Sequence, residues 1–155
     1  MPVLFLGLSN AFAASPLDPI SVAIARFNSN PQDPVEYSYI GIRCASLNTM
    51  IGYAYEYQGD GSPKTKKMAK IFKDDGEMFN HVGSAMGFMA KISGDYMLKQ
   101  FDSFLHIYGD EWTQSQKLNG TSWTPFIDSE VKSCETIKAS FKDMSEFIDK
   151  NSPKK

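Results

Sequence analysis

Apolar side chains recur every three or four residues along four long stretches of this chain, the pattern of helices that bury one face. The first stretch begins at Asp33-Pro34-Val35-Glu36, where Asp33 can cap a helix, Pro34 suits its first position and Glu36 can complete a capping box. Its apolar face then comprises Ile40, Cys44, Leu47 and Ile51. The pattern predicts a helix over residues 34–57 that ends at the glycines Gly59 and Gly61.

Two further helices are predicted on either side of a turn at Ser93-Gly94-Asp95. Ser62-Pro63 starts the earlier one, whose apolar positions are Met68, Phe72, Phe79, Val82, Met86 and Met89. Gly83 and Gly87 share a face of this helix, so we expect another helix to cross it closely there. The later helix stops at Asn119-Gly120, and its apolar positions are Met97, Phe101, Phe104, Leu105, Tyr108 and Trp112.

The last stretch begins at Thr124-Pro125 and ends near Lys150, with apolar or cysteine residues at Ile127, Val131, Cys134, Phe141 and Ile148. Four long helices joined by short links predict an all-α fold, an antiparallel four-helix bundle over residues 34–150. The first and last helices are neighbours in such a bundle, and Cys44 and Cys134 lie on their apolar faces. We therefore expect one disulfide between Cys44 and Cys134 to staple the bundle.

The residues before the bundle divide into two parts. Residues 1–13 resemble the end of a secretory signal peptide, because an apolar run precedes the small residues of Ala11-Phe12-Ala13. A basic start is missing and the run is short, so we predict a signal-peptide remnant; the alternative is an apolar arm packed on the domain. Residues 14–33 are predicted to form an arm or a short helix, although β-branched residues at 20–27 also permit a strand. Residues 151–155 are predicted to be a tail.

The two cysteines favour an exported protein. They lie far apart in sequence and outside any C-x-x-C motif, which fits a structural disulfide formed in an oxidising compartment. The alternative is a cytosolic protein with two buried thiols. Because no other stretch approaches the about 18 apolar residues of a membrane span, the sequence predicts no transmembrane segment and a periplasmic or secreted location.

Composition and charge argue against nucleic-acid binding. The chain has 155 residues, 42% of them hydrophobic and 22% charged, which suits one globular domain. Its formal net charge is −2, and the lysines at 64–70 are followed directly by acidic residues at 74–77, so the basic surface of a nucleic-acid-binding protein is not expected. Aromatic residues make up 13% of the chain, which predicts a core built from rings, with a ring-lined pocket as the alternative.

The most specific chemical hypothesis is a metal site. Glu77 and His81 lie one helical turn apart, as do His106 and Asp110. The two histidines are also about equally far from the turn near Gly94, so antiparallel helices would place them at one level. Two histidines and two carboxylates would then form a metal-binding bundle.

A second candidate is a partner-binding patch of aromatic residues at the link between the last two helices. Trp112, Trp123 and Phe126 surround this polar link, and exposed rings there would suit a partner; the alternative is that they cover the end of the bundle. No nucleophile elbow or phosphate loop occurs, so no catalytic residue is predicted. The sequence thus predicts a non-enzymatic binding or accessory protein for a partner or a small apolar ligand, with no cofactor. The alternatives are the metal-binding bundle and a structural or inhibitor-like module.

Overall fold

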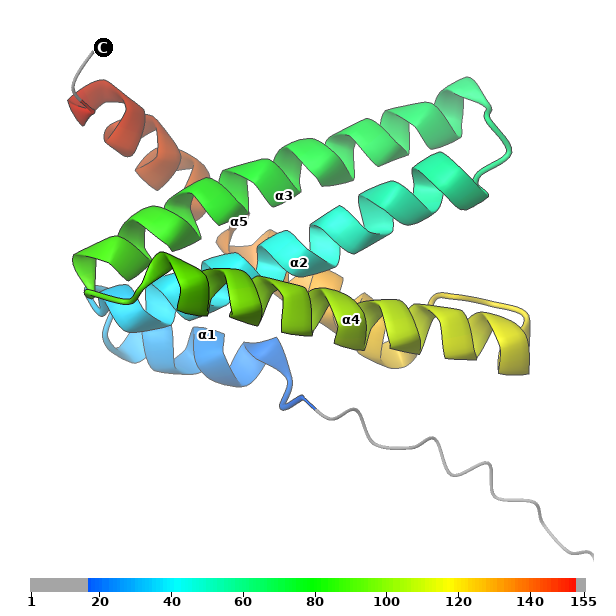
Figure 1. Cartoon of the computed structure of the whole chain (residues 1–155), viewed down its shortest axis with the longest axis horizontal. Helices are drawn as coiled ribbons and strands as arrows, with labels where there is room; N and C mark the ends of the chain where they lie inside the picture. Colours follow the sequence, from blue (N-terminus) through cyan, green and yellow to red (C-terminus); the bar gives the residue numbers. More distant parts are fainter. Residues whose placement is uncertain (1–16, 153–155) are drawn as a thin grey trace, which may run out of the picture.

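The computed structural model describes residues 17–152, which form five helices and no strand (Figure 1). The helices are α1 (Ile20–Ser29), α2 (Pro34–Gln58), α3 (Pro63–Met89), α4 (Gly94–Asn119) and α5 (Pro125–Asn151). The four long helices occupy the predicted stretches, and residues 20–29 are helix rather than strand. The signal-peptide prediction for residues 1–13 lies outside the described residues. Within the described part of the chain, no helix is long and apolar enough to cross a membrane.

Each long helix starts at a side-chain cap, as the sequence indicated for three of them. Asp33, Ser62, Ser93 and Thr124 each accept a hydrogen bond from a backbone N–H in the first turn. The capping-box prediction for Glu36 is wrong, because its carboxylate pairs with Arg26 of α1, with Nε and Oε1 2.6 Å apart. This pair helps to hold the short helix α1 beside the start of α2.

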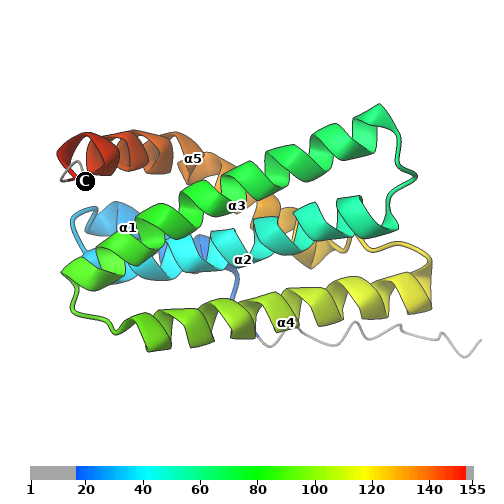
Figure 2. The same cartoon turned by 45° about the horizontal axis from the view of Figure 1, so that its top comes forward.

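The centre of the fold is α2, which packs against all four other helices and most extensively against α3. Figure 2 shows α2 between α3 on one side and α4 on the other. Residues 40–48 are all buried, so the expectation of a single apolar face was too narrow for this helix. Small and polar residues among them, including Gly41, Ala45 and Ser46, allow neighbouring helices to approach from every side.

Glycine residues set the close crossing of α2 and α3. A Cβ atom built on Gly41 would lie 2.6 Å from Cα of Gly83, and one built on Gly76 would lie 2.8 Å from Oγ1 of Thr49. A Cβ on Gly87 would lie 2.7 Å from Oγ of Ser38 and would collide with Sδ of Met97. The predicted close crossing at Gly83 and Gly87 is therefore confirmed, and it is an antiparallel contact of two backbones.

We expect Gly41→Ala to lower the free energy of unfolding by about 1–3 kcal/mol, because the added methyl group forces the two backbones apart. Gly109→Ala is the matched control: it lies inside α4, and beyond the neighbouring backbone of its own helix no atom lies within 4 Å of the added Cβ. This change should instead stabilise the protein by about 0.5–1 kcal/mol. Urea unfolding followed by circular dichroism measures both values. Equal effects of the two substitutions would contradict the steric account.

The predicted disulfide is confirmed. The sulfur atoms of Cys44 in α2 and Cys134 in α5 are 2.08 Å apart, and their Cα atoms are 5.8 Å apart. Both residues are buried, and the bond joins positions 90 residues apart in the sequence. It attaches α5 to the central helix.

Candidate functional site

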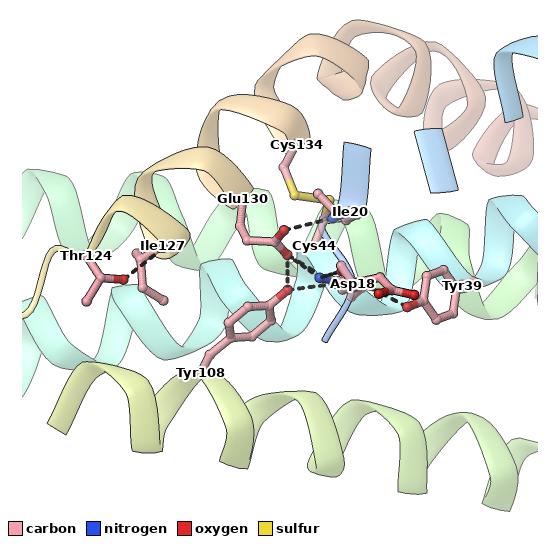
Figure 3. A network of polar contacts seen from close by, with 10 residues as sticks. Asp18, Ile20, Tyr39, Cys44, Tyr108, Thr124, Ile127, Glu130 and Cys134 are labelled. Carbon is pink, nitrogen blue, oxygen red and sulfur yellow. Dashed lines mark hydrogen bonds and ion pairs between the residues drawn. A yellow bond between two sulfur atoms is a disulfide. The ribbon is translucent and has the colours of Figure 1, made fainter. Parts of the chain in front are cut away.

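A fully buried ion pair joins Arg43 of α2 to Glu130 of α5, and Figure 3 shows Glu130 close to the Cys44–Cys134 disulfide. Both side chains are 1% exposed, and Nη2 of Arg43 is 2.6 Å from Oε2 of Glu130. The hydroxyl of Tyr108, from α4, donates to the same carboxylate oxygen at 2.6 Å and accepts a hydrogen bond from Nε of Arg43 at 2.9 Å. Three helices therefore meet at one charged cluster inside the protein.

The same cluster fixes the start of α1. Oε1 of Glu130 accepts the backbone N–H of Ile20 at 2.8 Å, and Nη2 of Arg43 donates to the backbone oxygen of Asp18 at 2.6 Å. The residue before α1, Pro19, offers no side-chain cap. A carboxylate at this position satisfies a free N–H and interacts favourably with the positive end of the helix dipole. Glu130 thus caps a helix that begins 110 residues earlier.

Protonation in the cluster is set by its surroundings. Burial alone would lower the pKa of Arg43, but its contacts with Tyr108 and Glu130 outweigh this effect and raise that pKa above its ordinary value. Burial, with the adjacent Glu130 carboxylate, raises the pKa of Tyr108 well above its ordinary value, so the phenol stays a neutral donor. Among the described residues, every buried side-chain nitrogen or oxygen has a hydrogen-bond partner. A closed and satisfied cluster of this kind is an anchor for the helices rather than a reaction centre.

The four residues of the predicted metal site are not brought together. Nε2 of His81 lies 3.1 Å from the carboxylate of Asp149 in α5. Nδ1 of His106 lies 2.7 Å from the backbone oxygen of Asp102 in its own helix. Within residues 17–152, no group of three or more histidine, cysteine, aspartate or glutamate side chains could hold a metal ion. The predicted grouping of Glu77, His81, His106 and Asp110 is therefore wrong, because α3 packs mainly on α2 rather than face to face with α4.

The three residues of the predicted aromatic patch have different positions. Trp112 is only 8% exposed and donates its indole N–H to Oε1 of Gln58 at 3.1 Å. Phe126 is half-buried and stacks on Tyr108, with ring centroids 6.0 Å apart. Trp123 is 37% exposed and meets Trp112 edge to face at a centroid distance of 5.7 Å. The two tryptophans thus lie together, while Phe126 covers the interior.

Trp112 and Trp123 line an open hollow of about 540 Å³, which we call the tryptophan hollow. Its lining residues come mainly from the ends of α2 and α4 and from the link to α5, segments that lie at one end of the fold in Figure 2. The side chains of Gln58, Gln116 and Ser122 also line it, and Oγ of Ser122 donates to Oε1 of Gln116 at 2.8 Å. The hydrogen bonds from Trp112 and Ser122 thus hold the amide oxygens of Gln58 and Gln116 in place.

A second surface, at the turn between α3 and α4, was missed by the sequence analysis. Phe88, Met89, Tyr96 and Leu98 are each more than half exposed, and we call them the turn patch. Phe88 and Leu98 line one hollow of about 260 Å³. The prediction that Met89 lies on the buried face of its helix is wrong, because its side chain is exposed. Phe88 and Leu98 lie outside the periodic apolar positions predicted for their helices. Large apolar residues off the buried face are the sequence feature that indicates an exposed apolar surface here.

Comparison with known proteins adds no relative. No protein-family model matches this chain, and neither the curated proteins nor the solved structures give a match. The function therefore has to be inferred from the chain's own residues and their arrangement.

Proposed function

We propose that this protein is an exported, non-enzymatic helical protein that binds a protein partner through the turn patch. The observation that carries the proposal is the set of four large apolar side chains, each more than half exposed, on one turn of the fold. Single exposed apolar residues are ordinary on a protein surface, but exposed apolar side chains that line one hollow together, as Phe88 and Leu98 do, are typical of a binding surface.

Export is supported by the disulfide and by the signal-like start of the sequence. A buried bond between cysteines 90 residues apart is a structural bond, and such bonds persist in oxidising compartments. We propose a periplasmic or secreted protein in which α2 to α5 act as an antiparallel four-helix bundle and α1 is attached to its side. The buried Arg43–Glu130 pair supports this arrangement, because it contacts the residues that start α1.

The surroundings of the turn patch indicate the chemistry of the partner. Exposed Lys91 lies in the turn itself and exposed Lys99 in the second turn of α4, against one exposed acid, Asp95, in its first turn. A partner surface with apolar side chains at its centre and carboxylates at its edge would match both features, since charged residues act mainly at the rim of an interface. Phe88 and Leu98, which share one hollow, are the expected anchors.

Site-specific crosslinking tests this proposal. A photo-reactive amino acid at position 98, in the full chain expressed in its native cells, should give one discrete covalent adduct with a partner protein. Phe88→Ser in the same chain should reduce the yield of that adduct by roughly tenfold, because losing a buried ring from an interface costs at least about 1.4 kcal/mol. The partner recovered in the adduct should carry acidic residues beside its crosslinked site.

Leu118 provides the matched control position. It is more exposed than Leu98 but lies at the other end of α4. The same reactive group at position 118 should give no such adduct. Equal adducts at both positions, or an adduct at 98 that does not respond to Phe88→Ser, would show that the turn patch is not the binding surface.

A further inference from the structure

The tryptophan hollow has properties that the turn patch does not share. The chain contains two tryptophans, Trp112 and Trp123, and both line this one hollow. Its volume of about 540 Å³ falls within the range of about 300–1,000 Å³ that is typical of small-molecule sites. The hollow and the turn patch lie at opposite ends of α4, so a ligand here would not compete with a partner there (Figure 1).

The lining of the hollow disfavours an anionic ligand. None of its lining residues has a charged side chain. The groove between α2 and α3 is a contrast within the same protein, because Glu56, Lys66, Lys70, Lys73, Asp74 and Glu77 line it. An anionic ligand in the tryptophan hollow would lose hydration without gaining an opposite charge, and it would lie at the C-terminal ends of α2 and α4, which carry partial negative charge. The ligand of this hollow is therefore not an anion.

Polar groups around the hollow call for a ligand that can accept hydrogen bonds. The Nε2 amides of Gln58 and Gln116 and the indole N–H of Trp123 have no hydrogen-bond partner among the described residues. A purely apolar ligand would remove water from these donors and offer nothing in exchange. The ligand therefore carries oxygen atoms as well as apolar surface.

The carbonyl groups at the end of α2 favour a ligand that also donates hydrogen bonds. In the described part of the chain, no backbone N–H caps the last turn of α2 at Gly59, whereas α3, α4 and α5 each have such a bond. The last carbonyl groups of a helix need donors from outside it. Gln58 and Gly59, at this end, line the hollow. Hydroxyl groups would supply these donors.

We propose that the tryptophan hollow binds an uncharged saccharide. The C–H face of a sugar ring is apolar and packs on aromatic rings, while its hydroxyl groups both donate and accept hydrogen bonds. Trp123 is the exposed aromatic surface for that packing, and its contact with Trp112 holds it in place. This site is independent of the turn patch, so either proposal can fail without the other.

Because both tryptophans line the hollow, intrinsic fluorescence of the full oxidised chain reports on this site. We expect saturable changes in tryptophan emission on titration with at least one of three neutral trisaccharides: maltotriose, cellotriose and tri-N-acetylchitotriose. Trigalacturonate, an anionic trisaccharide of similar size, should give no saturable change. If no neutral trisaccharide binds, or if the anionic one binds equally well, the proposal is wrong.

Substitutions locate the binding by calorimetry. Trp123→Ala should weaken binding of the responding trisaccharide by at least about tenfold, and Trp123→Phe, which keeps a ring, should stay within about threefold of the original affinity. Phe147→Ala removes an exposed ring from α5, outside the hollow, and should leave binding unchanged. Saccharide binding that is unaffected by Trp123→Ala, in a variant with an unchanged circular dichroism spectrum, would place the site elsewhere and overturn the proposal.

Discussion

Glu130→Ala is expected to lower the free energy of unfolding by about 3–5 kcal/mol, the usual cost of removing one partner from a buried ion pair. The substitution leaves the guanidinium of Arg43 buried without its 2.6 Å partner. It also removes the acceptor of the Ile20 N–H at the start of α1 and of the Tyr108 hydroxyl. Urea unfolding monitored by circular dichroism gives the value directly.

Glu146→Ala is the matched control, because it makes the same chemical change on the same helix. Glu146 is 55% exposed and lies 3.8 Å from Lys150 in an i,i+4 pair, so its loss should change stability by no more than about 0.5 kcal/mol. Replacing both Arg43 and Glu130 by apolar residues of similar size should cost less than Glu130→Ala alone, because no buried charge is then left. A loss below about 1 kcal/mol for Glu130→Ala would contradict the role assigned to this pair.

The second large effect is expected from removal of the disulfide. Replacing both Cys44 and Cys134 by alanine should lower the free energy of unfolding by about 4–5 kcal/mol, because the bond closes a loop between positions 90 residues apart and restricts the unfolded chain. Guanidinium chloride unfolding of the oxidised protein and of the double variant measures the difference. The m-value, which is the slope of the unfolding free energy against denaturant concentration, should be larger for the variant, since its unfolded state exposes more surface.

Reduction provides an independent check of the same bond. Both cysteines are buried, so a reductant should leave the bond intact under native conditions and cleave it only when the protein unfolds. The oxidised protein unfolded and refolded with reductant should then match the alanine variant in stability. A difference of less than about 1 kcal/mol between the bonded protein and the variant would show that the disulfide is not a main determinant of the fold.

The long helices could be predicted because their signals are local, and the disulfide because the chain has two cysteines, each on the apolar face of a predicted helix. Asp33, Ser62 and Thr124 each precede a proline, and each caps a helix in the structure. The buried ion pair could not be predicted in this way. Arg43 lies between Ile42 and Cys44 in a helix whose burial on all sides depends on four other helices, and a lone charged residue in such a pattern is ordinarily expected to face solvent.

The candidate sites differ in the same way: a contact between residues close in sequence could be predicted, and one that depends on helix packing could not. Trp112 in α4 and Trp123 in the link that follows it are close in sequence, and the structure keeps them together. The metal hypothesis required His81 and His106 to face each other across two helices. That arrangement depended on the packing partner of α3, which is mainly α2, and a single sequence carries no direct signal for the choice of partner.

The close crossing of α2 and α3 also restricts how this protein can change over evolutionary time. Ala69, Gly76 and Gly83 follow one another at intervals of seven residues along α3, on the side where the backbone of α2 approaches. Larger residues cannot replace them one at a time without separating the helices, whereas the exposed side of α3 can accept many substitutions. A distant descendant could therefore lose most of its sequence identity to this chain and still keep two features. These are three small residues at seven-residue intervals in α3 and the cysteine pair that joins α2 to α5.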